Sequence, residues 1–192
     1  LMMMKYSSVK TDADPLLHTL RAACMRGMHY LASTQEPNGS WYGRWGCNYI
    51  YGTSHVLCGL AYFVEKRLVC VMVKSALQWL KSRQNDDGGW GESLLSYQSP
   101  DREQQASTPS QTAWALMGLL SHLPVTDDAI ERGIRYLVSS QRPEKGIGSS
   151  WPQAEYTGTG LPNHFYLGYD YYRHYFPMMA LGRYLQGSRG LN

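Results

Sequence analysis

The 192-residue sequence lacks a long apolar run, a zinc-type motif and any concentration of charge. No stretch reaches the roughly 18 apolar residues of a bilayer-spanning helix, so the sequence predicts none. Charged residues make up 17% of the chain, against about a quarter in an average soluble protein. The net charge of +3 comes from basic residues scattered along the chain, which argues against nucleic acid as a partner.

The four cysteines and six histidines show none of the spacings of a metal site, so we expect no metal ion. We expect the cysteines to be buried reduced thiols, which favours the cytosol; they are Cys24, Cys47, Cys58 and Cys70. The first residues lack the apolar region of a signal peptide. The chain opens on Leu rather than Met, which we interpret as the sign of a fragment.

A pattern of glutamine, Gly-rich turn and tryptophan recurs along the chain. It runs from Gln35 to Trp41 and from Gln84 to Trp90, and a looser copy with an insertion covers residues 141–151. The first two copies lie 49 residues apart (35 to 84, and 41 to 90). Repeats of this length are typical of stacked helical hairpins rather than of one irregular domain.

The three residue types of the repeat suit a clasp between helices. A glutamine at a helix end can bond to the backbone groups that helix ends leave unpaired. Glycine permits a tight reversal, and an indole can lie on the amide while its N–H finds an acceptor. We therefore expect the repeats to have a structural role and not to bind a ligand.

Apolar spacing predicts six helices and no strand. The sequence indicates an all-α fold of helical hairpins that can stack in an arc or form part of an (α/α) barrel, with residues 1–192 in a single domain. We expect Ser54 to cap the second helix, Pro177 to kink or delay the last one, and residues 92–108 to form a surface loop. The predicted helices cover residues 15–34, 54–66, 70–83, 112–120, 127–140 and 169–186.

Longer motifs carry a family resemblance. They are Gly43-Arg-Trp-Gly-Cys-Asn-Tyr-Ile-Tyr-Gly-Thr53, Ala106-Ser-Thr-Pro-Ser-Gln-Thr-Ala-Trp-Ala115, the aromatic-rich stretch from Tyr156 to Pro177, and Ala180-Leu-Gly-Arg-Tyr184. Together with the repeats they resemble the squalene–hopene cyclases, a family of class II triterpene cyclases. The resemblance covers residues 27–186 in unbroken order and corresponds to the C-terminal part of far longer enzymes.

The resemblance implies two α-helical barrels around an apolar cavity, of which this chain would be a C-terminal portion. Enzymes of this family protonate a terminal alkene of squalene or a similar polyene lipid and guide the cation through successive ring closures. They use no metal ion or organic cofactor. They are monotopic proteins that collect the lipid from a membrane surface, here on the cytoplasmic side. The resemblance also implies an upstream N-terminal cyclase segment as a partner and allows a homodimer.

The family's general acid is the central aspartate of an Asp-x-Asp-Asp motif, which is absent from the 192 residues. The aspartates at 12–14, 86–87 and 127–128 are interpreted as turn or helix-cap residues. The family's histidine partner of the acid would fall near Ser7, where the match is poor. Either the acid lies on a missing segment, or this piece does not cyclise a substrate alone.

By resemblance, four residues would serve catalysis. Phe165 would stabilise late cations, Tyr169 and Tyr172 would line the middle and early parts of the cavity, and Tyr51 would relay the proton beside the acid. The face of an aromatic ring attracts a desolvated cation by about 2 kcal/mol or more. Composition alone favours ordinary core aromatics, whereas the family match favours the catalytic interpretation.

Four further residues would contact the substrate by resemblance. Trp45 would hold an early part of it, and Tyr166 and Leu167 would shape the cavity. Leu161 stands where the family usually has phenylalanine. Because leucine has no π face, we expect weaker cation stabilisation there, with early termination or an altered ring count.

Two other functions stay open. A noncatalytic α-hairpin scaffold that binds a lipid or a protein would explain the missing acid, but it has no need of the dense aromatic run. A protein prenyltransferase-type barrel also uses stacked hairpins, but the Asp, Cys and His set for its zinc ion is not found in the sequence.

Overall fold

The computed structural model describes residues 15–63, 67–99, 105–146 and 148–189. Ser7 and the aspartates at 12–14 lie outside these ranges. The described chain is mostly helical, as predicted, and includes the short 3₁₀ helices η1 (Ala61–Phe63) and η2 (Leu94–Tyr97). The α-helices are α2 (Pro15–Thr34), α3 (Tyr49–Leu60), α4 (Arg67–Ser82), α5 (Pro109–Leu120), α6 (Asp128–Ser140) and α7 (Tyr172–Ser188).

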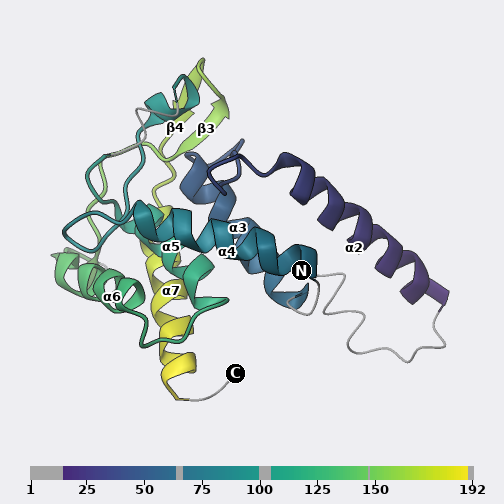
Figure 1. Ribbon diagram of the computed structural model, residues 1–192. Helices are drawn as coiled ribbons and strands as arrows, with labels where there is room; N and C mark the ends of the chain where they lie inside the picture. Colours follow the sequence, from purple (N-terminus) through teal and green to yellow (C-terminus); the bar gives the residue numbers. More distant parts are fainter. Residues whose placement is uncertain (1–14, 64–66, 100–104, 147, 190–192) are drawn as a thin grey trace.

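Helix α5 lies in the middle of the molecule, whereas α2 extends away from the other helices (Figure 1). The sequence of α5 contains no charged residue, and every residue from Pro109 to Leu119 is buried. The helix contacts α3, α4, α6 and α7, with Trp114 and Leu116 fully buried among them. A helix without a polar face is stable only in such a central position.

Several predicted helix starts are wrong by three or more residues. The second helix begins at Tyr49, and Ser54 is buried inside it instead of capping it. The first N–H groups of α3 bond to the distant Glu92, so no local cap is required there. Helices α4 and α5 each begin three residues before the predicted start, and α7 begins three residues after it. Pro177 lies inside α7.

The expectation of no strand is also wrong, because the described chain contains two short antiparallel hairpins. Strand β1 (Arg142–Glu144) pairs with β2 (Gly148–Ser150) around the insertion of the third repeat. Strand β3 (Gly158–Leu161) pairs with β4 (Phe165–Leu167), and the connection includes Asn163 at a left-handed φ of 66°. Strands of three or four residues are too short to produce a readable alternation.

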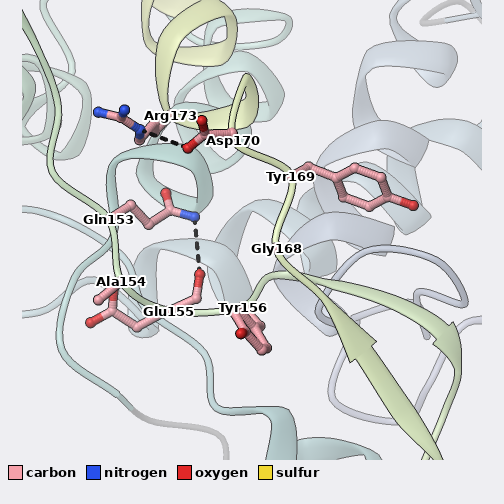
Figure 2. A pocket seen from close by; sticks show the side chains of 8 residues that line it. All are labelled: Gln153, Ala154, Glu155, Tyr156, Gly168, Tyr169, Asp170 and Arg173. Atoms are coloured by element: carbon pink, nitrogen blue, oxygen red, sulfur yellow. Dashed lines mark hydrogen bonds and ion pairs between the residues drawn. The ribbon is translucent and has the colours of Figure 1, made fainter.

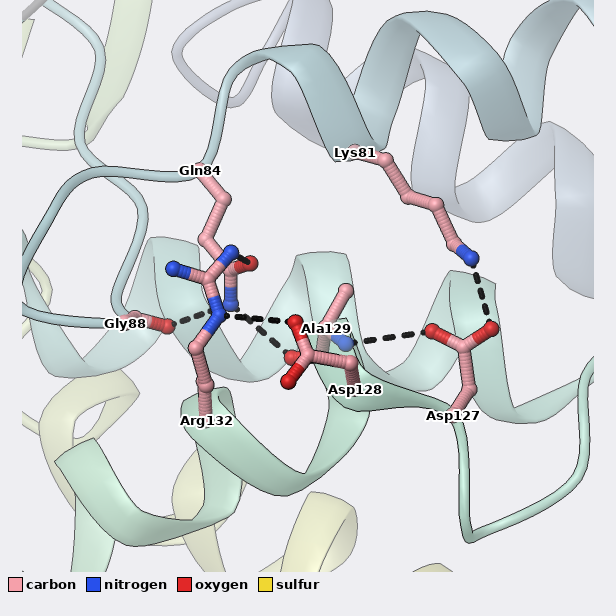
Figure 3. A network of polar contacts seen from close by, with 7 residues as sticks. All are labelled: Lys81, Gln84, Gly88, Asp127, Asp128, Ala129 and Arg132. Atoms are coloured by element: carbon pink, nitrogen blue, oxygen red, sulfur yellow. Dashed lines mark hydrogen bonds and ion pairs between the residues drawn. The ribbon is translucent and has the colours of Figure 1, made fainter.

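The second Gln…Trp turn links α4 to α6. The Gln84 amide donates hydrogen bonds to the carbonyls of Gly88 at 2.8 Å and Ala129 at 2.9 Å. The Trp90 indole N–H donates to the carbonyl of Leu80 at 2.8 Å. Figure 3 shows Gln84 reaching from the turn to the start of α6. The turn therefore joins the end of α4 to the start of α6.

The first turn makes the same contacts between α2 and α4. The Gln35 amide donates to the carbonyls of Gly39 at 2.8 Å and Met72 at 3.0 Å. The Trp41 indole N–H donates to the carbonyl of Leu31 at 2.8 Å. Both turns thus have the clasp geometry expected from a glutamine and a tryptophan at a helix end.

The third turn keeps only part of this geometry. The Trp151 indole N–H donates to the carbonyl of Leu137 at 2.7 Å, which matches the tryptophan contacts of the other two turns. Gln141 is exposed, and the inserted residues form the β1–β2 hairpin. The insertion therefore replaces the glutamine half of the clasp with strand pairing.

Candidate active site

The segment around Trp45 pairs with the start of β3. The N–H of Thr159 donates to the carbonyl of Trp45 at 3.0 Å, and Gly46 and Gly158 form an antiparallel bridge. This pairing places Trp45 beside the β3–β4 hairpin. The hairpin carries four other predicted site residues, which are Leu161, Phe165, Tyr166 and Leu167.

Two candidate rings rest against the paired glycines. A Cβ atom on Gly46 would come within 2.4 Å of the Tyr51 ring, and one on Gly158 within 2.5 Å of the Tyr169 ring. Contacts this short are not tolerated, so a glycine is required at each place. One backbone bridge therefore positions Tyr51 and Tyr169, although they are far apart in sequence.

Two of the four predicted catalytic rings contact Trp114, and a third stacks on one of these two. The Trp114 ring makes edge contacts with Tyr51 and Tyr172, with centroids 5.0 and 5.9 Å apart. The Tyr169 ring stacks on Tyr172, with a centroid distance of 4.6 Å and an interplanar angle of 23°. We call Tyr51, Trp114, Tyr169 and Tyr172 the ring cluster. It joins α3, α5 and the start of α7.

Two phenols of the ring cluster, those of Tyr51 and Tyr172, have a raised pKa. Burial raises the pKa of Tyr51, and burial together with the neighbouring tyrosines raises the pKa of Tyr172 to about 12. Both side chains therefore stay protonated near neutral pH. A neutral phenol offers the negative face of its ring without supplying the strong base that would remove a proton from a carbocation.

Phe165, the fourth predicted catalytic residue, lies on the hairpin. It pairs with Leu161 across the two strands, and a Cβ atom on Gly160 would come within 2.1 Å of its ring. Tyr166 and Leu167 are half-buried on the same strand. The predicted residues other than Trp45 thus lie in the ring cluster or on the hairpin. We call Leu161, Phe165, Tyr166 and Leu167 the hairpin group. Gly158 connects the two groups, because it belongs to β3 and lies against the Tyr169 ring.

Several site residues are open to solvent. Trp45 is 55% exposed, Phe165 is 53% exposed, and Leu161 and Tyr169 are each 43% exposed. The Arg44 guanidinium lies over the Trp45 ring, 5.3 Å from its centroid. The described residues bring these side chains to adjoining backbone segments but do not enclose them. A dry cavity would need a further covering element.

Sequence reasoning missed Glu92, which is buried at the start of α3. Its carboxylate accepts hydrogen bonds from the N–H groups of Asn48 at 3.1 Å and Ile50 at 2.7 Å. Burial raises the pKa of Glu92, although the backbone N–H groups oppose this shift. Glu92 fixes the helix end that carries Tyr51. The sequence offers no signal for a cap supplied from more than 40 residues away.

Tyr97 was also missed, because it falls in the predicted loop. Its hydroxyl donates to the carbonyl of Gly46 at 2.8 Å, and its ring lies 6.1 Å from the Tyr166 ring. The Asn163 amide of the hairpin turn reaches the carbonyl of Tyr97 at 3.5 Å. Tyr97 therefore ties the hairpin to the glycine that supports Tyr51.

A polar cavity of about 220 Å³ lies on the other side of the Tyr169 backbone. Figure 2 shows the Tyr169 ring directed away from Asp170 and Arg173. The Arg173 side chain pairs with the Asp170 carboxylate at 3.4 Å, and the Gln153 amide donates to the carbonyl of Glu155 at 3.3 Å. The charges of Asp170 and Arg173 therefore lie on the side of the backbone away from the Tyr169 ring.

The expectation of four buried cysteines is partly wrong. Cys47 is buried, Cys24 and Cys58 are half-buried, and Cys70 is exposed. Cys70 follows the buried Val69 on α4, so helical geometry turns its side chain outward. Within the described ranges, no group of three or more His, Cys, Asp and Glu side chains could hold a metal ion. No helix there is long and apolar enough to cross a bilayer.

Residues 14–186 match the model of the squalene–hopene cyclase C-terminal domain family. The chain belongs to this family. It is 50% identical over 162 residues to the squalene–hopene cyclase of Alicyclobacillus acidocaldarius, a match that covers 84% of this chain and 25% of that enzyme. It is 45% identical over 174 residues to a terpene cyclase–glycosyl transferase fusion protein of Humicola fuscoatra, covering 88% of this chain and 13% of that protein.

Membership of the squalene–hopene cyclase C-terminal domain family agrees with the fold. The structure resembles ent-copalyl diphosphate synthase from Streptomyces platensis, with a TM-score of 0.53 at 19% identity, over 91% of this chain and 30% of that one. At this identity the likeness supports the fold alone. The chain spans a quarter or less of the length of the two cyclase relatives.

Proposed function

We propose that this chain supplies the cation-stabilising wall of a triterpene cyclase that acts on squalene or a similar polyene. The observation that carries the proposal is the ring cluster, in which Tyr51 and Tyr172 contact Trp114 and Tyr169 stacks on Tyr172. Cyclisation of a protonated polyene moves positive charge along a hydrocarbon. Ring faces that are already in position stabilise such charge without reorganising.

The proposed roles follow the two groups of residues. Tyr51 would stand beside the general acid and relay its proton, and Tyr169 and Tyr172 would stabilise early and middle cations. Phe165 would stabilise the late ones. Tyrosine side chains are neutral near pH 7, and burial raises the pKa of Tyr51 and Tyr172 further, so neither supplies a phenolate that would end the reaction by taking a proton from the cation.

The hairpin group and Trp45 would shape the substrate. Trp45 would hold an early part of the polyene, and Tyr166 and Leu167 would border the cavity near Phe165. Leu161 pairs with Phe165 but has no π face. We therefore propose that late cations are less stabilised here than in a cyclase with an aromatic residue at this position.

The general acid would come from an upstream cyclase segment, since the 192 residues contain no Asp-x-Asp-Asp motif. The same segment would cover Trp45 and Phe165, whose exposure is incompatible with a dry cavity. We also propose that the chain forms a single domain that is the C-terminal portion of a barrel. It would lie at a membrane surface on the cytoplasmic side and could form a homodimer. These last points rest on the resemblance alone.

The direct test is a chimera in which this chain replaces the matching quarter of the Alicyclobacillus acidocaldarius enzyme. We expect the purified chimera to convert squalene to cyclic products detected by gas chromatography and mass spectrometry. The unmodified enzyme is the positive control, and circular dichroism verifies folding. A folded chimera that leaves squalene untouched would contradict the proposal and favour a noncatalytic scaffold.

A further inference from the structure

A second cavity, of about 190 Å³, lies between α3, α5 and α7. It shares Trp114 with the ring cluster and extends from there along the three helices as far as Arg183. The polar cavity of Figure 2 is lined by other residues. Part of its wall is apolar and is formed by Met117, Phe176 and Met179. The rest of the wall carries polar groups, and two of them have no hydrogen-bond partner among the described residues.

Two of these groups are buried and unpaired. Ser54 and Trp114 line the cavity, and neither the Ser54 hydroxyl nor the Trp114 indole Nε1 has a hydrogen-bond partner among the described residues. Buried polar atoms without a partner are rare in native proteins. The indole can only donate a hydrogen bond, so a ligand that satisfies it must offer an acceptor.

Arg183 adds a positive charge to the same wall. Its Nη1 donates to the sulfur of Cys58 at 3.3 Å and to the carbonyl of Met117 at 3.4 Å. No carboxylate of the described residues lies within ion-pair distance of it. The neighbouring His55 donates through Nδ1 to the carbonyl of Tyr51 at 2.8 Å, and burial lowers its pKa. The wall therefore holds a half-buried cation for which the described residues supply no acidic partner.

The geometry points to a carboxylate ligand: we propose that the cavity receives an Asp or Glu side chain from polypeptide outside these 192 residues. This inference rests on the proposed function, which requires such an upstream segment. The relatives extend far beyond the matched region. An acidic side chain brings acceptors and negative charge to Arg183 and Trp114, while its methylene groups fit against Phe176 and the methionines.

Other ligands fit this wall less well. A hydrocarbon substrate offers no acceptor, so it would leave the donors unpaired and strip water from Arg183. A phosphate would place polar oxygen against Met117, Phe176 and Met179. A carboxylate on an aliphatic stem satisfies both parts of the wall.

The first experiment titrates acetate into the 192-residue chain labelled with 5-fluorotryptophan and follows the fluorine resonance of Trp114, assigned with Trp114→Phe. We expect a saturable shift with acetate that equal concentrations of chloride do not produce. Arg183→Met should weaken acetate binding at least ten-fold, and the matched control Arg189→Met should leave it unchanged. The Trp90 resonance monitors the fold of each variant. A shift no larger with acetate than with chloride, or one that Arg183→Met preserves, would overturn the proposal.

The second experiment identifies the source of the carboxylate. In the chimera with the Alicyclobacillus acidocaldarius enzyme, the upstream segment should fill the cavity, so acetate should no longer shift Trp114. A Trp114 shift that persists in the chimera would mean that the cavity takes a dissolved carboxylate, which overturns the assigned source. The acetate titration does not depend on squalene turnover. Failure of the cyclase proposal is therefore distinguishable from failure of this one.

Discussion

The Glu92 carboxylate accepts a hydrogen bond from the backbone N–H of Tyr49 at 2.9 Å, across 43 residues of sequence. The contact lies at the first turn of α3, where the helix dipole favours a negative charge. Tyr51 follows two residues later on the same turn. The buried acid that stabilises this helix end therefore also positions a ring of the proposed site.

Replacing Glu92 with alanine should destabilise the protein strongly. Three backbone N–H groups would lose their buried acceptor, and we expect a loss on the order of 3 kcal/mol in the free energy of unfolding, measured with urea. Glu92→Gln keeps one side-chain oxygen as an acceptor, so the free energy of unfolding should fall by less than in Glu92→Ala. The control Glu131→Ala, in the exposed first turn of α6, should cost less than about 1 kcal/mol. A loss from Glu92→Ala no larger than that of the control would contradict the capping role.

Two glycines with the same backbone conformation separate strain from packing in the second clasp. Gly88 has a φ of 87° and Gly146 a φ of 85°, but a Cβ atom on Gly88 would lie 2.7 Å from the carbonyl oxygen of Arg132, whereas one on Gly146 meets nothing within 4 Å. Gly146→Ala should cost about 1 kcal/mol from the left-handed backbone. Gly88→Ala should cost clearly more in thermal and urea unfolding, and equal losses would show that the close approach is unimportant.

His122 should make stability depend on pH. Its Nε2–H donates to the carbonyl of Leu57 at 2.8 Å, and burial lowers its pKa from 6.5. The unfolded state then binds the proton more readily, so stability is fully present above about pH 6.5 and falls as the pH drops through the folded-state pKa. The urea midpoint should decrease between pH 7.5 and pH 6, and His122→Gln should reduce this slope. His55, whose pKa burial also lowers, should contribute to the slope in the same direction. A slope unchanged by His122→Gln would contradict the assignment.

Leu161→Phe should extend cyclisation in the chimera. The substitution adds a π face beside Phe165, its partner across the hairpin, and Leu161 is exposed enough to accept a larger side chain without repacking the core. We expect a larger share of fully cyclised products in the chromatogram. Leu161→Met, which changes size without adding a ring, is the matched control. An equal product distribution in both variants would mean that this position does not face the cation.

The sequence predicted features of the fold that depend on hydrogen bonds between residues close together in the chain. Asp127, interpreted from the sequence as a turn or helix-cap residue, accepts a hydrogen bond from the N–H of Ala129 at the start of α6. Such caps lie within three residues of the groups they satisfy, so they can be read along the chain. Gln35 and Gln84 also have local partners four residues further on, the carbonyls of Gly39 and Gly88, but their partners on the next helix are 37 and 45 residues away.

Long-range contacts could not be read in this way. The bridge between Gly46 and Gly158 and the bond from Tyr97 to Gly46 depend on how distant segments meet. Helical periodicity reports only which side of one element is apolar. The family resemblance named Tyr51 and Tyr169 as site residues, but nothing in the sequence revealed the backbone bridge against which both rings lie.

The most direct test of the cation-stabilising role compares two neighbouring tyrosines in the chimera. Tyr169 belongs to the ring cluster, whereas Tyr171 is 77% exposed. Loss of a ring worth about 2 kcal/mol to the transition state should slow squalene turnover roughly 30-fold. We therefore predict that Tyr169→Ala lowers kcat by about this factor or yields truncated products, while Tyr171→Ala stays within about two-fold of the unsubstituted chimera. Equal turnover and equal products in the two variants would contradict the account.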